Sequence, residues 1–124
     1  MGAVTTHLEL PEHRPCLAVV GAGGSIGEQL CRRLSSRYRV VAITGLGTRV
    51  HAADPDGDIE WRFCDFFSLT DMEQVLSGAS SAIFLAHSGL PNAKLEQAYC
   101  SDMDLLMAEN FARAAESLAL EHIV

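Results

Sequence analysis

The sequence predicts an α/β fold, a doubly wound parallel sheet of about five strands in the order 3-2-1-4-5. Short apolar runs alternate with amphipathic segments, and most runs are apolar throughout, as strands buried on both faces require. A glycine-rich turn joins the first run to the first amphipathic segment. Helical crossovers would make such strands parallel, with the glycine turn beside the switch between strands one and four.

The first predicted strand and helix flank this turn. Residues 17–20 (LAVV) suit a buried strand because the run is short and rich in β-branched residues. Ile26, Leu30 and Leu34 recur at helical spacing and predict the helix. The glycines of residues 21–27 (GAGGSIG) therefore lie on a strand-to-helix turn.

The glycine turn predicts a site for a phosphate group. The first N–H groups of a helix have no partner within it and the dipole is positive there, so a phosphate binds where the backbone can approach. We expect a side chain at Gly21 to crowd the turn, one at Gly24 to fill the space of a pyrophosphate, and one at Gly27 to hold the helix off the strand. A turn required for packing alone is the alternative to a dinucleotide site.

The central elements follow in chain order. Residues 39–44 are a second buried strand, residues 45–58 a polar loop, and residues 59–64 a third strand whose alternating pattern suits a sheet edge. Ser68 begins a helix through an S-x-x-D pattern, and Gly78 ends it.

Three segments complete the predicted fold. Residues 81–86 are an apolar strand, residues 94–118 a long helix, and residues 122–124 the start of a fifth strand. The apolar positions that predict the long helix are Leu95, Ala98, Tyr99, Leu105, Leu106, Phe111, Ala112, Ala115 and Leu118.

The charge and the apolar runs of the sequence argue against nucleic-acid and membrane partners. The 124 residues carry a net charge of -7 and no basic stripe that could follow a nucleic-acid backbone. No apolar run is long enough to span a membrane, and residues 1–16, predicted as a tail before one domain at residues 17–124, lack the pattern of a signal peptide. We therefore expect a cytoplasmic protein with no nucleic-acid or membrane partner.

The cysteines are predicted to be reduced and structural. They are widely spaced with no C-x-x-C pair, and the five histidines show no ligand spacing to each other or to a cysteine. The sequence therefore predicts no metal site. The cysteines are Cys16, Cys31, Cys64 and Cys100.

Four motifs in chain order resemble a known group of proteins. They are GAGGSIG at 21–27, DFFSLTD at 65–71, GASSAIFLA at 78–86 and NFARAA at 110–115. Together they resemble the amino-terminal half of an extended or atypical short-chain dehydrogenase/reductase, the group that includes NAD-dependent epimerase/dehydratases and NmrA-like proteins. The resemblance covers residues 17–124 and implies a Rossmann fold, incomplete at its carboxyl end, that binds NAD or NADP.

The resemblance implies a place near the cofactor for each matching residue. The pyrophosphate would lie on the glycine turn, the adenine beside the residues after strand three, and the ribose and nicotinamide beside the end of strand four. In that order the residues are Gly21, Gly24, Ser25, Ile26 and Gly27; Asp65 and Phe66; and Leu85, Ala86 and His87.

Three residues have structural alternatives. Asp65 could instead cap the next helix. His87 could be packed or solvated, which is commoner for a single histidine after a strand than catalysis. Asn110 would be an internal polar contact of the long helix, or a solvated residue on it.

The sequence departs from the group after strand two. An NAD-binding turn usually has Asp or Glu there to accept the ribose hydroxyls, but residues 44–49 (TGLGTR) contain no acid. Arg49, and less plausibly Arg32 or Arg33, could pair with a 2′-phosphate, so NADP is favoured over NAD. An exposed loop arginine is the alternative for Arg49.

A second departure concerns catalysis. The group uses a Ser or Thr beyond strand five and a Tyr-x-x-x-Lys motif for proton exchange during hydride transfer. Here Tyr38 is followed four residues later by Ala42, and Tyr99 by Met103, so no catalytic residue is assigned. We expect a fragment, domain or truncated form that is inactive alone.

The function implied is therefore the dinucleotide-binding part of an NAD(P)-dependent oxidoreductase or epimerase, whose small-molecule substrate binds a carboxyl-terminal region outside this chain. One alternative is an NmrA-like redox-sensing regulator without turnover, and another is a structural module with an empty site. The resemblance also implies a homodimer through the helix at residues 94–118.

Overall fold

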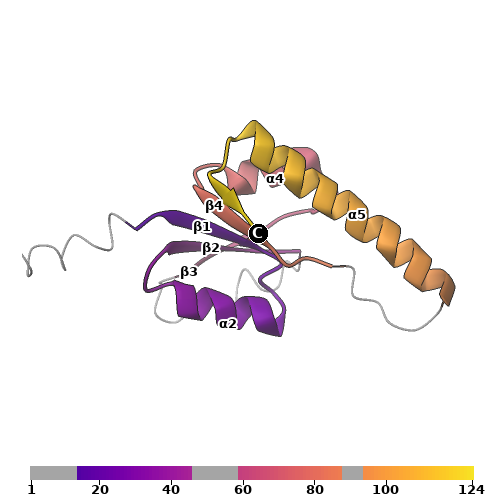
Figure 1. The fold of residues 1–124 in the computed structure, drawn as a ribbon. Helices are drawn as coiled ribbons and strands as arrows, with labels where there is room; N and C mark the ends of the chain where they lie inside the picture. Colours follow the sequence, from indigo (N-terminus) through magenta and orange to yellow (C-terminus); the bar gives the residue numbers. More distant parts are fainter. Residues whose placement is uncertain (1–13, 46–58, 88–93) are drawn as a thin grey trace, which may run out of the picture.

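The computed structural model describes residues 14–45, 59–87 and 94–124, with the backbone alone at residues 94–100 (Figure 1). The described elements are β1 (Cys16–Val20), α2 (Ser25–Leu34), β2 (Arg39–Thr44), β3 (Ile59–Phe63), α4 (Leu69–Leu76), β4 (Ser81–Phe84), α5 (Lys94–Ser117) and β5 (His122–Ile123). Each predicted strand and helix is present, with bounds that differ by at most two residues. Most of the predicted loop at 45–58 lies outside the described residues.

The described strands form one parallel sheet in the order β3-β2-β1-β4-β5, which confirms the predicted fold class and topology. Every residue of the central strand β1 is buried, which explains its uniformly apolar run. In the register, Ala18 of β1 lies between Val41 of β2 and Ala82 of β4. The strand order reverses between β1 and β4, so the turns after these strands meet at the carboxyl edge.

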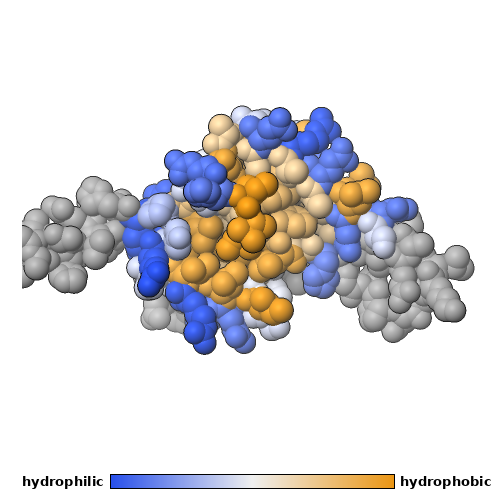
Figure 2. Space-filling model, in the orientation of Figure 1, coloured by the Kyte–Doolittle hydropathy of each residue, from blue (hydrophilic) through white to orange (hydrophobic). Residues whose placement is uncertain are grey.

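Helices cover both faces of the sheet (Figure 1), and the space-filling view in the same orientation shows apolar residues gathered at its centre with polar residues around them (Figure 2). On one face, Leu17 and Val19 of β1 pack with Cys31 of α2 in one apolar cluster. On the other face, Ala18 and Val20 pack in a second cluster with residues of α4 and α5. The alternation of side chains along β1 thus divides the core into two layers.

The buried face of α2 differs from the prediction. Ile26, one of the three apolar residues whose spacing predicts the helix, is 74% exposed. The helix instead turns Gly27 and Cys31 toward β1, and both are buried. Only glycine fits at position 27. The helix therefore contacts the turn after β1 through a residue that a hydrophobic pattern does not identify.

The buried face of α5 also differs. Leu105 and Leu106, predicted as core positions, are 68% and 52% exposed, whereas Met107, Phe111 and Ala114 are buried. Apolar residues occur on more than one side of this helix, so their spacing alone did not select the side that meets the sheet.

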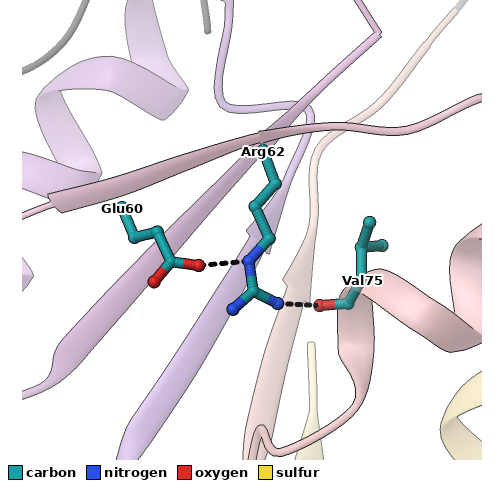
Figure 3. A network of polar contacts seen from close by, with 3 residues as sticks. All are labelled: Glu60, Arg62 and Val75. Atoms are coloured by element: carbon teal, nitrogen blue, oxygen red, sulfur yellow. Dashed lines mark hydrogen bonds and ion pairs between the residues drawn. The ribbon is translucent and has the colours of Figure 1, made fainter.

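The edge strand β3 is tied to α4 by an arginine. Figure 3 shows the Arg62 guanidinium between two acceptors: its Nε donates to the Glu60 carboxylate, and its Nη1 donates to the Val75 carbonyl oxygen at 3.3 Å. Val75 lies in the last turn of α4, where carbonyls lack helical partners and a cation is favourable. The charged residues also make β3 a poor template for pairing with another chain.

Three described cysteines, Cys16, Cys31 and Cys64, are free and buried. Burial raises the pKa of Cys31 to about 12, with a further contribution from Glu28. Burial, with the nearby carboxylates of Asp71 and Asp65, likewise raises the pKa of Cys64 to about 12. Both thiols therefore stay protonated near neutral pH. Of the described helices, none is both long and apolar enough to cross a membrane.

Candidate functional site

A cavity of about 720 Å³ opens at the carboxyl edge of the sheet, where β1, β2, β3 and β4 end. Its walls come from the last residues of these strands, the turns after them, and α5. The lining residues are Gly21, Gly23, Gly24, Thr44, Gly45, Phe63, Cys64, Asp65, Phe66, Phe67, Leu85, Ala86, His87, Met103 and Met107. The cavity lies at the switch point, where ligands of doubly wound sheets bind.

Gly21 brings the turn after β1 against the end of β4. Its φ is +92°, and a Cβ atom there would lie 2.6 Å from the Ala86 nitrogen and 2.8 Å from the Leu85 carbonyl carbon. The N–H groups of Gly21 and Ala22 both donate to the Ile43 carbonyl oxygen of β2, at 2.8 and 3.0 Å. The turn is therefore held between two strand ends, with no room for a side chain at position 21.

Gly27 brings the start of α2 onto this turn. A Cβ atom at Gly27 would lie 2.7 Å from the Ala22 Cα and 2.8 Å from the Gly21 carbonyl oxygen. Because these neighbours are backbone atoms, they cannot swing aside as a flexible side chain would. The helix is thus fixed close to β1 with its first turn beside the cavity.

Gly24 leaves the start of α2 without a side-chain cap. It is the N-cap residue, its backbone is extended, and a Cβ atom there would meet nothing within 4 Å. By contrast, α4 is capped in the usual way, with Ser68 Oγ accepting from the Asp71 N–H at 3.2 Å. The uncapped, positively polarised start of α2 faces open space, which suits a bound anion.

The turn after β3 is held by its own hydrogen bonds. The Asp65 carboxylate accepts from the Phe67 N–H at 3.0 Å, and the Asp65 carbonyl accepts from the Ser68 N–H at 3.0 Å. Asp65 therefore closes the turn, and Ser68, rather than Asp65, caps α4. The carboxylate of Asp65 is exposed at the cavity.

Phe66 is contacted from two sides. A Cβ atom at Gly45, just after β2, would lie 3.3 Å from its ring, so the ring covers that glycine. The Asn110 side-chain amide of α5 donates to the Phe66 carbonyl oxygen at 3.2 Å. Met103 and Met107 of the same helix complete the cavity wall.

The structure brings most of the predicted site residues to one cavity. Ser25 and Ile26 are exposed in the first turn of α2 and Gly27 is buried behind it, so these three do not line the cavity. Arg49 lies outside the described residues. The predicted residues that line the cavity are Gly21, Gly24, Asp65, Phe66, Leu85, Ala86 and His87.

Several lining residues were missed by the sequence reasoning. Thr44, Gly45 and Phe63 lie where predicted strands two and three end, and the shared edge of parallel strands could have indicated them. Met103 and Met107 stand four apart on the long helix, and nothing in the local sequence connects them to the glycine turn. The missed lining residues are Gly23, Thr44, Gly45, Phe63, Cys64, Phe67, Met103 and Met107.

The cavity offers binding groups rather than a nucleophile. The pKa of Cys64 is raised to about 12, so its thiol remains protonated. His87 is exposed at the rim. Within the described residues, no group of three His, Cys, Asp or Glu side chains could hold a metal ion. Backbone N–H groups beside aromatic and thioether surfaces suit a ligand with phosphates and an aromatic base.

Comparison with known proteins identifies the family. A family model described as the NAD dependent epimerase/dehydratase family matches residues 17–124, which include the glycine turn and the whole cavity. The chain belongs to this family. It is an NAD(P)-binding Rossmann domain of the epimerase/dehydratase type.

The relatives are distant and longer. The chain is 26% identical over 102 residues to the auxiliary protein GraX of Staphylococcus aureus, covering 82% of this chain and 33% of that protein. A GalE-like L-threonine dehydrogenase from Cupriavidus necator superposes with a TM-score of 0.73 at 18% identity, over 88% of this chain and 35% of the other. An NAD complex of a uronate dehydrogenase mutant from Agrobacterium tumefaciens gives 0.68 at 18% identity, over 89% and 39%. The chain thus spans between a third and two fifths of the length of these proteins.

The open space at Gly24 leads to a prediction. Gly24→Asp should weaken dinucleotide binding at least about 10-fold, because a carboxylate would face the diphosphate across the uncapped start of α2. The melting temperature should change little, since a Cβ atom at this position meets no described atom beyond the neighbouring backbone within 4 Å. Isothermal titration and thermal denaturation of the same sample measure both quantities.

Gly21→Ala is the matched control. It should lower the melting temperature clearly for two reasons. Its Cβ atom would overlap the backbone of Leu85 and Ala86, and residue 21 has a positive φ, which alanine disfavours. Unchanged affinity in a folded Gly24→Asp protein would contradict the placement of the diphosphate at the start of α2.

Proposed function

We propose that the domain binds the dinucleotide with its diphosphate at the start of α2, its adenine beside Asp65 and Phe66, and its nicotinamide toward Ala86 and His87. The observation that carries this proposal is the uncapped helix start at Gly24, which opens onto a cavity with aromatic walls. A diphosphate matches the first feature and an adenine ring the second.

We further propose that the domain prefers NADP to NAD. An Asp or Glu at the position just after β2 would bind the ribose hydroxyls of NAD and repel the 2′-phosphate of NADP. The residue that follows β2 is Gly45, which lines the cavity, and a Cβ atom there would lie 3.3 Å from the Phe66 ring, which would have to shift slightly to admit a side chain. Arg49 would supply the positive charge that pairs with the phosphate.

In the whole protein, the domain would hold the cofactor for oxidoreductase or epimerase chemistry on a small or sugar-like molecule. Substrate binding and proton transfer would come from the rest of the whole protein, outside the part of the relatives' length that this domain matches. A cytoplasmic location remains a prediction.

A second candidate is a regulator that binds the dinucleotide without turnover. One observation favours it: the curated relative at 26% identity is named an auxiliary protein rather than an enzyme. Assays on the full-length protein would separate the two, since steady oxidation of NADPH with a carbonyl or nucleotide-sugar substrate supports the enzyme.

We propose that two copies of the domain associate through α5. Leu105 and Leu106 form an exposed apolar pair on that helix, 68% and 52% exposed, which a second copy would cover.

The first prediction from this function concerns cofactor choice. Wild-type protein should bind NADP more tightly than NAD, and Arg49→Glu should weaken NADP binding about 10-fold or more while changing NAD little, because it replaces a phosphate partner with a repelling charge. Isothermal titration of both cofactors provides the measurement.

Arg37→Glu is the charge-matched control. Arg37 is exposed and lies just before β2, at the opposite edge of the sheet from the cavity, so both affinities should be kept. Equal losses of affinity for NADP and NAD in Arg49→Glu would show that this arginine does not determine the choice of cofactor. Absence of binding by either cofactor to the folded wild type would contradict the function itself.

The second prediction is that this chain alone does not turn over. Hydride transfer to a carbonyl needs a proton donor, worth about 10²–10⁴ in rate, and the sequence contains no Tyr-x-x-x-Lys motif. NADPH oxidation should stay at background with aldehydes, ketones and nucleotide sugars. Steady turnover that His87→Ala abolishes would show that the chain carries its own catalyst.

The third prediction concerns assembly. Sedimentation velocity should show a dimer that Leu105→Glu with Leu106→Glu converts to a monomer, since two charges would be buried at the contact. Ile123→Glu, at an exposed apolar residue of β5, should leave the dimer intact. Dissociation by Ile123→Glu alone would place the contact at β5 instead.

A further inference from the structure

A long-range side-chain hydrogen bond reaches the cavity lining from Asn110. This residue lies in the last half of α5, and its amide donates to the Phe66 carbonyl oxygen at 3.2 Å across 44 residues of sequence. Both residues are partly buried. A bond of this kind between a helix and a turn is worth more when it is shielded from water, and it fixes one group relative to the other.

The bond from Asn110 holds the turn after β3 relative to α5, which the turn's own hydrogen bonds do not do. The contacts among Asp65, Phe67 and Ser68 give the turn its shape, but all lie within four residues of sequence. They do not fix where the turn sits over the sheet. Longer-range contacts do so. The Cys64 N–H donates to the Thr44 carbonyl oxygen just before the turn. Phe66 itself is held by its ring against Gly45 and by its carbonyl oxygen against Asn110.

The two contacts of Phe66 come from different elements. Gly45 follows β2, and Asn110 belongs to α5, which also provides Met103 and Met107 to the cavity wall. Phe66 is therefore held between the end of the sheet and the helix that closes the cavity. Loss of either contact would remove one of the restraints on Phe66, which borders the cavity together with Asp65.

We propose that Asn110 is a positioning residue for recognition of the adenosine half of the dinucleotide, acting through the Phe66 carbonyl. The inference rests on the proposed function, because it takes the adenine to lie beside Asp65 and Phe66. Asn110 does not line the cavity and makes no contact with the ligand in this scheme. The nicotinamide half, at the end of β4, does not depend on it.

Ser117 provides a matched control. Its hydroxyl lies two turns further along α5 and donates to the Glu73 carboxylate of α4 at 3.1 Å, an exposed bond remote from the cavity lining. Ser117→Ala therefore also removes one hydrogen bond between α5 and its neighbours. It differs from substitutions of Asn110 in not touching the turn after β3.

The experiment compares Asn110→Leu, Asn110→Asp and Ser117→Ala with the wild type by NMR of the 124-residue chain. ADP and nicotinamide mononucleotide are titrated separately, which measures each half of the site even when binding is weak. Both Asn110 variants should bind ADP about 3- to 10-fold more weakly, as expected for one lost hydrogen bond, and bind the mononucleotide as the wild type does. Asn110→Asp keeps the shape but presents only acceptors to the carbonyl, so it separates the bond from packing.

Amide hydrogen exchange gives a second readout without ligand. The Phe67 and Ser68 amides should exchange faster in both Asn110 variants, while amides of β1 and α2 keep their rates. Ser117→Ala should change neither the exchange of these two amides nor the affinity for ADP.

The outcomes separate this inference from the function on which it rests. Wild-type affinity for ADP in both Asn110 variants would overturn the inference and leave the function standing. Equal losses for ADP and the mononucleotide, with a lower melting temperature, would assign Asn110 a purely structural role. A wild type that binds neither ligand would refute the proposed function and the inference together.

Discussion

Backbone-to-backbone contact at the end of β1 determines the rest of the site. Gly21 lies against the backbone that follows β4, and Gly27 lies against the turn that contains Gly21. Neither contact admits a Cβ atom, so only glycine at these positions lets α2 begin this close to the ends of β1 and β4. The open space at Gly24 follows from this arrangement, because it lies on the turn between the two contacts.

The two sides of the cavity are built on different principles. On the α2 side, the N-cap residue Gly24 makes no side-chain hydrogen bond to the first turn of the helix. On the α4 side, the turn after β3 is closed by Asp65 and tied to α5 through Asn110, and Ser68 caps α4. One side thus provides an uncapped helix start and the other a surface held in place, a combination that favours an anionic ligand with a rigid ring.

The sequence predicted the order of elements and the topology because strand runs and glycine positions are local signals. The strand-to-helix turn also indicated Gly21 and Gly24, and the resemblance to the family added Asp65 and the residues after β4. The apolar spacing of the sequence did not indicate which residues of α2 meet the sheet, because the helix buries Gly27 and Cys31 and leaves Ile26 exposed. The partner of Asn110 could not be predicted, since the geometry that brings it to Phe66 arises only when α5 packs beside α4.

The buried thiols give each layer of the fold a chemical reporter of its own. Cys31 lies in the cluster beneath α2, and Cys64 in the cluster beneath α4 and α5. Because burial keeps both protonated, a thiol reagent reaches either one only when its layer opens. The labelling rates of the two cysteines would therefore distinguish detachment of one helical layer from cooperative unfolding of the whole domain.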